Sequence, residues 1–67
     1  MVANMEQSIL KELDRQNFRA NIISTVMKHL DTNDKKSMFL SFLIENRGTI
    51  LEVDTLLNKL KEIKQYN

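Results

Sequence analysis

The chain has no cysteine, no proline and no tryptophan, and it holds one glycine and one histidine among its 67 residues. Without cysteine there can be no disulfide and no zinc site built on thiolates. A single glycine cannot form a glycine-rich phosphate loop, and the lone His29 would need several carboxylates around it to hold a metal. We therefore expect no cofactor, no metal and no small-molecule substrate, and we expect that the protein is not an enzyme.

Neither sign of charge dominates the chain, because ten basic residues stand against nine acidic ones and the net charge is +1. Proteins that bind nucleic acid through its phosphates commonly carry a clustered basic surface. The longest apolar stretch, 38–44, is far shorter than the ~20 residues that a membrane-spanning helix needs. No basic segment followed by a long apolar core opens the chain, as a secretory signal would. We expect neither nucleic acid nor a membrane as a partner, and a cytoplasmic location.

The near absence of glycine, the lack of proline and the scarcity of alternating β-branched residues together predict an all-α fold. We expect a single helical domain over residues 1–67, with residues 1–4 frayed. The predicted architecture is a compact bundle of three to four short helices over residues 5–15, 18–30, 33–46 and 49–64. A domain of this length buries only about 60% of the surface of its unfolded chain, so we also expect it to be oligomeric.

The boundary between the first two helices carries no glycine or proline, so one continuous helix is an alternative there. On a helical wheel, however, the apolar faces of the two segments point about 120° apart. A straight helix would therefore direct its two apolar faces toward different neighbours. We favour a break within residues 14–17, with Asn17 as the cap that starts the second helix.

The later boundaries are marked by capping residues. Any residue of 31–33 could cap the start of the third helix, because Asp, Thr and Asn side chains accept hydrogen bonds from free helix amides. Gly48 stands just past the end of that helix, where a left-handed backbone is favoured. Thr49 and Glu52 then have the spacing of a capping box, which predicts that the fourth helix begins at Thr49.

The predicted fourth helix has one apolar stripe, and its charges follow the helix dipole, with acidic residues in the first turn and lysines in the last turns. The stripe consists of Ile50, Val53, Leu56, Leu57, Leu60 and Ile63. We expect this stripe to face the rest of the bundle.

The third helix has more apolar surface than a small bundle needs. Six of the seven residues in MFLSFLI, 38–44, are apolar and cover an arc of about 240°, whereas a surface helix needs only about 100°. One interpretation is that this helix is the core of the bundle and is wrapped by the other three. The other is that part of it binds a second copy or a partner protein. The predicted interface consists of Met38, Phe39, Phe42, Leu43, Leu51 and Tyr66, with the two phenylalanines as anchors.

Segment 37–60, SMFLSFLIENRGTILEVDTLLNKL, is similar in outline to the first half of winged-helix DNA-binding domains, where an apolar helix, a turn with glycine and a second helix precede the recognition helix. Against this, Glu52 and Asp54 stand where a reading helix would contact bases, and phosphate repels them. We therefore expect a small non-enzymatic protein-interaction module, an adaptor or regulator that buries an apolar helix surface against a partner or itself. The alternative is a small dimeric helix-turn-helix-like transcription regulator that binds DNA.

Overall fold

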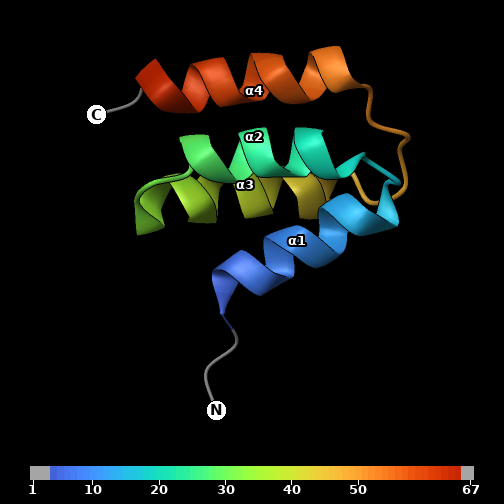
Figure 1. Ribbon diagram of the computed structural model, residues 1–67, viewed down its shortest axis with the longest axis horizontal. Coiled ribbons are helices and arrows are strands. Elements are labelled where there is room, and N and C mark those ends of the chain that lie inside the picture. Colours follow the sequence, from blue (N-terminus) through green and yellow to red (C-terminus); the bar gives the residue numbers. More distant parts are fainter. Residues whose placement is uncertain (1–3, 66–67) are drawn as a thin grey trace.

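Four α-helices account for most of residues 4–65, the part of the chain that the computed structural model describes (Figure 1). They are α1 (Met5–Arg15), α2 (Ala20–His29), α3 (Asn33–Glu45) and α4 (Val53–Gln65). The described residues contain no β-strand, so the prediction of an all-α bundle is confirmed. The predicted fraying of residues 1–3 and the predicted interface residue Tyr66 lie outside this part. Asn4, expected to be frayed, caps α1 instead, because its side-chain oxygen accepts from the Glu6 amide.

The helices form a ring in which each one packs against two neighbours. α1 packs against α2 and most extensively against α3, and α4 packs against α3 and α2. α2 and α3 follow each other in the chain, yet they lie across the core from each other, as do α1 and α4. α2 and α4 run in the same direction, so both end at the same end of the molecule (Figure 1). This arrangement leaves one groove between α1 and α3 and another between α2 and α4.

The core draws side chains from all four helices and from the linker after α3. Phe39 is the largest of the fully buried side chains. The buried hydrophobic residues are Ile9, Leu13, Val26, Leu30, Phe39, Leu43, Leu51, Leu56, Leu60 and Ile63. Burying an aliphatic or aromatic side chain of this size contributes about 1.5–3 kcal/mol. In a chain without cysteine, this cluster is what holds the four helices together.

The predicted break between α1 and α2 is confirmed, but Asn17 serves it in a different way from the one predicted. Asn17 has φ 64°, a left-handed conformation that asparagine tolerates better than most residues. Its amide donates to the Asp14 carbonyl at 2.9 Å, and the Phe18 amide donates to the Leu13 carbonyl at 3.3 Å. These two bonds define a Schellman motif, with Asn17 in the place usually taken by glycine. Asn17 therefore ends α1 rather than starting α2, and α2 begins at Ala20 instead of residue 18.

The start of α3 is as predicted, but the role predicted for glycine at its end is wrong. Thr32 caps α3, with its hydroxyl accepting from the Lys35 amide at 3.2 Å. Gly48 does not adopt the left-handed conformation expected of it, since no glycine in the described residues has a positive φ. Asn46 ends the helix instead, because its side-chain amide donates to the Phe42 carbonyl at 2.8 Å and satisfies a free carbonyl of the last turn. The observed ends of α2, α3 and α4 each differ by one residue from the predicted ends.

The predicted start of α4 at Thr49 is also wrong. α4 begins at Val53, so Thr49 and Glu52 do not cap it as a box. The physical reason is the burial of Leu51, which is 7% exposed and belongs to the core cluster. A helix starting at Thr49 would place Ile50 on the apolar stripe and Leu51 off it. The observed linker does the reverse and leaves Ile50 89% exposed.

Candidate interaction surface

The residues predicted to form an interface do not share one surface. Phe39, Leu43 and Leu51 are buried together in the core. Met38 and Phe42 are half-buried. Phe42 lies on the flank of α3 that faces α4, where the Lys59 Nζ atom is 5.4 Å from the centre of its ring, within cation–π range. A role for the buried residues in binding another molecule stays a prediction, and in this fold it would require α3 to be uncovered.

The opposite flank of α3 faces α1 and is covered in part. A groove of about 300 Å³ separates the two helices, and Leu40 and Ile44 supply its apolar lining. The polar lining residues are Ser8, Lys11, Glu12, Arg15 and Arg47. Ile44 remains 45% exposed. α1 and α4 thus cover most of the wide apolar arc of α3. What remains open is Ile44 and part of each half-buried side chain, namely Met38, Leu40 and Phe42.

Three of the five exposed large hydrophobic side chains in the described residues lie in one short segment. The five are Leu10, Ile44, Ile50, Val53 and Leu57. Val53 and Leu57 are 38% and 36% exposed and stand four residues apart, so they share one side of α4, with Ile50 just before the helix. Lys61 and Lys64 continue the same side over the next turns. We call this row, Ile50, Val53, Leu57, Lys61 and Lys64, the α4 strip.

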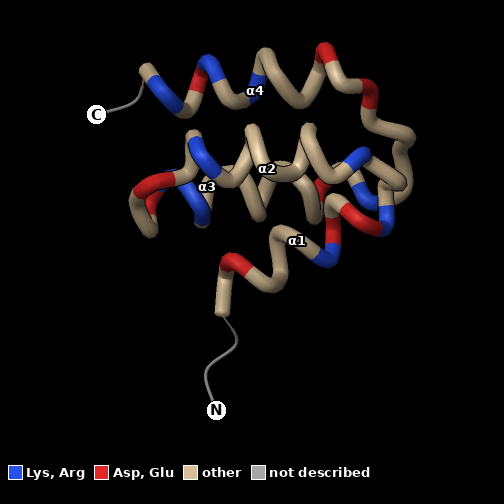
Figure 2. The backbone as a smooth tube through the Cα atoms, in the orientation of Figure 1, with Lys and Arg blue, Asp and Glu red and all other residues tan. Residues whose placement is uncertain are grey.

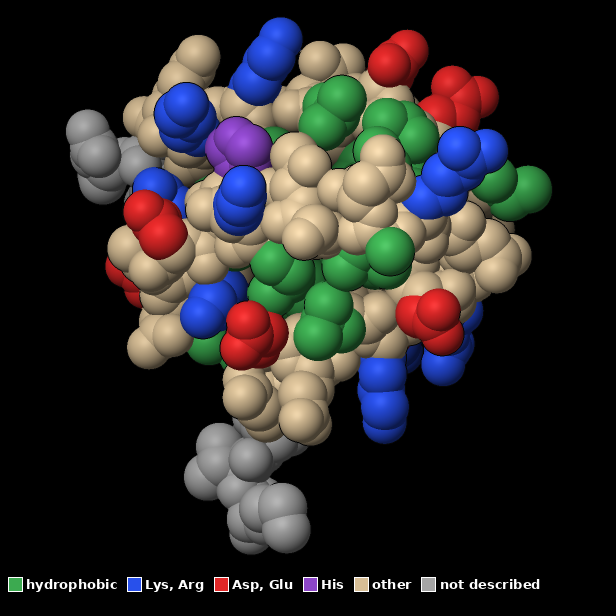
Figure 3. All heavy atoms as spheres, viewed as in Figure 1, with side chains coloured by type: hydrophobic (Ala, Val, Ile, Leu, Met, Phe, Trp, Pro, Cys, Tyr) green, Lys and Arg blue, Asp and Glu red, His purple; other side chains and the backbone are tan. Residues whose placement is uncertain are grey.

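The α4 strip changes character along its length. Figure 2 shows acidic residues before and at the start of α4, and mostly basic residues over its second half. In Figure 3, hydrophobic side chains gather over the first half of α4, and basic side chains surround His29 near the other end. Positive charges at this end complement the dipoles of α2 and α4, which both terminate there. The strip therefore has an apolar half and a cationic half.

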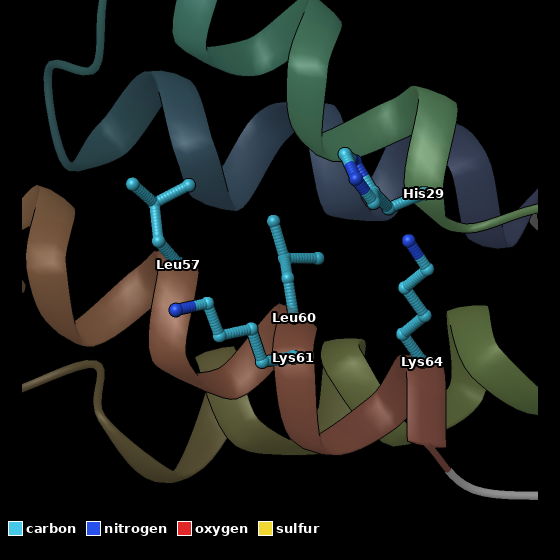
Figure 4. A pocket seen from close by; sticks show the side chains of 5 residues that line it. All are labelled: His29, Leu57, Leu60, Lys61 and Lys64. Carbon is cyan, nitrogen blue, oxygen red and sulfur yellow. The ribbon is translucent and has the colours of Figure 1, made fainter.

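A hollow of about 250 Å³ lies where the α4 strip meets the end of α2 (Figure 4). Leu57 and Leu60 supply its apolar lining, and Lys61, Lys64 and His29 supply its basic edge. In Figure 4, Leu60 and Lys64 extend from α4 toward α2, and His29 stands across from them. The hollow thus has an apolar floor and, beside it, basic side chains that can bind a negatively charged group.

The neighbours of His29 limit the chemistry that its ring can support. The Nδ1 atom lies 2.8 Å from the Thr25 carbonyl oxygen, so Nδ1 carries a proton and donates it in this bond. No carboxylate lines the hollow, so the ring has no acidic partner there of the kind that orients a catalytic histidine. Across residues 4–65, no group of three or more His, Asp or Glu side chains is placed to hold a metal ion.

On the other side of the molecule, α1 holds the linker between α3 and α4. Glu12 is buried and accepts from Arg47 Nη2 at 2.8 Å and from Arg47 Nε at 3.2 Å to each carboxylate oxygen. The hydrogen bonds from Arg47 hold the pKa of Glu12 below its ordinary value. Gln16 donates to the Thr49 carbonyl at 3.0 Å and accepts from the Leu51 amide at 3.2 Å. These contacts set the path of the linker and bring Leu51 into the core.

Sequence reasoning missed both of these polar anchors. Glu12 and Gln16 stand four residues apart, and on a helical wheel they fall on the same side of α1 as Ile9 and Leu13. A charged side chain and an amide on an apolar face need partners, because burying them unpaired is costly. The placement of Glu12 and Gln16 on the apolar face of α1 was therefore the sequence signal that both residues have partners within the fold. Nothing in the sequence shows that the partner of the carboxylate is Arg47, 35 residues away.

The corner between α3 and α4 differs from a helix-turn-helix. Its linker, residues 46–52, is longer than the turn of about three or four residues in that motif. α3 and α4 pack side by side and run in opposite directions (Figure 1). Asp54 in the first turn of α4 puts a negative charge where a recognition helix contacts bases. The DNA-binding alternative gains no support from this geometry.

Comparison of the chain with models of protein families, with curated proteins and with solved structures found no match in any of the three. None of the helices in the described part combines the length and the apolar character needed to cross a membrane.

Proposed function

We propose that the protein is a non-enzymatic interaction module, an adaptor or regulator that works by burying the α4 strip against another polypeptide. The observation that carries this proposal is the exposure of Val53 and Leu57 on one side of α4, next to the hollow, with the exposed Ile50 just before the helix. Single exposed hydrophobic residues are ordinary on protein surfaces, whereas neighbouring exposed hydrophobic residues bordered by charges are typical of an interaction site.

The two halves of the strip would serve different purposes in binding. Removing apolar surface from water contributes roughly 25 cal/mol per Å², so Leu57 and its apolar neighbours would supply affinity. Lys61, Lys64 and His29 at the edge of the hollow would select a partner that brings negative charge to that end. Binding of this kind needs no catalytic group, which agrees with the composition of the chain.

A substitution at the centre of the strip tests the proposal. Leu57→Asp places a carboxylate in the apolar row, and Thr55→Asp places the same group on the exposed far side of the same helix as a matched control. The full chain and both variants would be used to capture partners from the native cell, and each captured protein would then be purified and its affinity measured directly. A partner bound by the wild type and by T55D, and bound at least about tenfold more weakly by L57D, is the expected result.

The far-ultraviolet circular dichroism spectrum of each variant shows whether it keeps the helical fold. A folded L57D variant that keeps the partner, and the mass in solution, of the wild type would contradict the proposal.

A further inference from the structure

We infer that the polypeptide bound along the α4 strip is a second copy of this chain, with the two α4 helices crossing in opposite directions at Leu57. This inference rests on the proposed function and names the occupant of the same strip.

The pattern of charge along α4 is the first support. Asp54 precedes Leu57, and Lys61 and Lys64 follow it, so α4 carries a negative charge beside the apolar half of the strip and positive charges in its other half. Asp54 and Lys61 are seven residues apart, which places them within about 20° of each other around the helix. Both therefore border the same face as Leu57. Reversing a second α4 across this face brings the acidic end of each copy to the basic end of the other.

The spacing of the charges fits a crossing at Leu57. Asp54 lies three residues before Leu57 and Lys61 four residues after it, or about 4.5 Å and 6 Å along the helix axis. In an antiparallel pair, Asp54 of one copy would thus stand opposite Lys61 of the other, and symmetry would repeat the contact. A parallel pair would set Asp54 against Asp54 and Lys61 against Lys61, which is repulsive. The charges select the antiparallel pair, whose two halves use the same patch, as a two-fold dimer does.

The hollow and the exposed apolar residues of α4 form the second support. Val53 lies four residues before Leu57 in the helix, and Lys61, at the edge of the hollow, lies four residues after it. Crossing at Leu57 therefore brings Val53 of each copy next to the edge of the hollow of the other. The exposed parts of Val53 and Leu57 would then be covered by the second α4.

The charges that the pairing uses are not engaged elsewhere in the described chain. Within residues 4–65, the ion pairs join Lys35 to Asp31 and Arg47 to Glu12. Asp54, Lys61 and Lys64 take part in neither. An interface between copies would give Asp54 and Lys61 partners without breaking an ion pair that the fold already makes.

The size of the surface sets the expected strength of the pairing. α4 has 13 residues and is therefore about 20 Å long, so the strip and the rim of the hollow offer less than the ~1,600 Å² typical of a stable interface. We expect a dimer that dissociates in the micromolar range and weakens as salt screens its charges.

The test mixes two variants of the full chain and measures mass by sedimentation over concentrations from a few to several hundred micromolar. Asp54→Lys alone places a lysine opposite Lys61 of the second copy, and Lys61→Asp alone places an aspartate opposite Asp54 of the second copy. Each variant alone should dissociate at least about tenfold more readily than the wild type. The mixture of D54K with K61D should recover pairing, because both contacts between unlike copies become attractive. Lys11→Asp, at the groove between α1 and α3 and away from α4, changes the net charge as K61D does and should leave the dimer intact.

Each result decides the inference. A wild type that stays monomeric overturns it, and so does a dimer whose mass is unchanged by both variants, since that dimer is built on another face. Failure of the mixture to recover pairing also overturns it. A monomeric wild type that captures a different protein through Leu57 would overturn this inference and leave the proposed function standing.

Discussion

The two grooves of the molecule contain similar residue types but use them differently. Between α1 and α3, the carboxylate of Glu12 meets Arg47 and the amide of Gln16 meets the linker, so these polar groups are satisfied within the chain. Between α2 and α4, Lys61 and Lys64 surround an apolar hollow without an ion pair among the described residues. A charge that the chain pairs itself, as it does at Glu12 and Arg47, is not available to another molecule.

The largest effect should come from the core on which both grooves depend. Phe39→Ala removes a fully buried ring and should cost about 3–5 kcal/mol, enough to unfold much of a domain this small. Leu57→Ala on the open strip should cost about 1 kcal/mol or less, because its side chain is already partly in water. Urea unfolding at low micromolar protein concentration measures both losses. Equal losses would show that the α4 strip is part of the core.

A smaller effect should follow from breaking the ion pair between Arg47 and Glu12, which joins the linker to α1. Arg47→Ala leaves the buried Glu12 carboxylate without its partner and should lower Tm by roughly 5–10 °C. Lys35→Ala breaks the exposed pair with Asp31 and should lower Tm by about 2 °C or less. Thermal unfolding at neutral pH compares the two. If R47A lowers Tm no more than K35A does, the Arg47–Glu12 pair does not hold the linker against α1.

Acid provides a control for the same pair. Since the pKa of Glu12 is lower in the folded chain than its ordinary value of 4.5, the pair stabilises the fold above that value. The contribution is lost as the pH falls through the pKa of the folded state. The difference in Tm between the wild type and R47A should therefore be constant from pH 7 to about pH 5 and should shrink below about pH 4. A difference that persists at pH 3 would assign the effect to packing of the Arg47 side chain.

The smallest effect should come from Gln16. Gln16→Ala removes two hydrogen bonds to the linker and should cost about 1 kcal/mol. The Leu51 amide, which donates to Gln16, should then exchange its hydrogen about fivefold faster, while amides in the middle of α3 should change less. Gln7→Ala, on the exposed part of α1, is the matched control. Uniform acceleration across the chain would indicate global destabilisation rather than release of the linker.

The helices could be predicted because their signals are local. The apolar spacing of α1 and the turn residues before α3 specify these elements without reference to the rest of the chain. The predicted break at residues 14–17 is also correct, since one straight helix would have sent two apolar faces in different directions.

The start of α4 could not be predicted in this way, because a distant contact overrides a local preference. Thr49 and Glu52 have the spacing of a capping box, but burial of Leu51 and its hydrogen bond to Gln16, together with the bond from Gln16 to the Thr49 carbonyl, favour a non-helical linker. The same shift moved Ile50 from a predicted core position to the surface. The α4 strip is therefore a product of tertiary packing, and the sequence pattern alone pointed to Phe39 and Phe42 instead.

The ring order of the helices has a consequence for how the chain could be divided. The most extensive packing joins α1 to α3, and further packing joins α2 to α4. Each of the first two helices therefore packs against one of the last two. A cut between His29 and Asn33 would leave two fragments, and neither could enclose Phe39 by itself. They would have to fold on each other, as two different subunits do. The single chain thus consists of two helix pairs, α1 with α2 and α3 with α4, that pack against each other and are joined by a short connection.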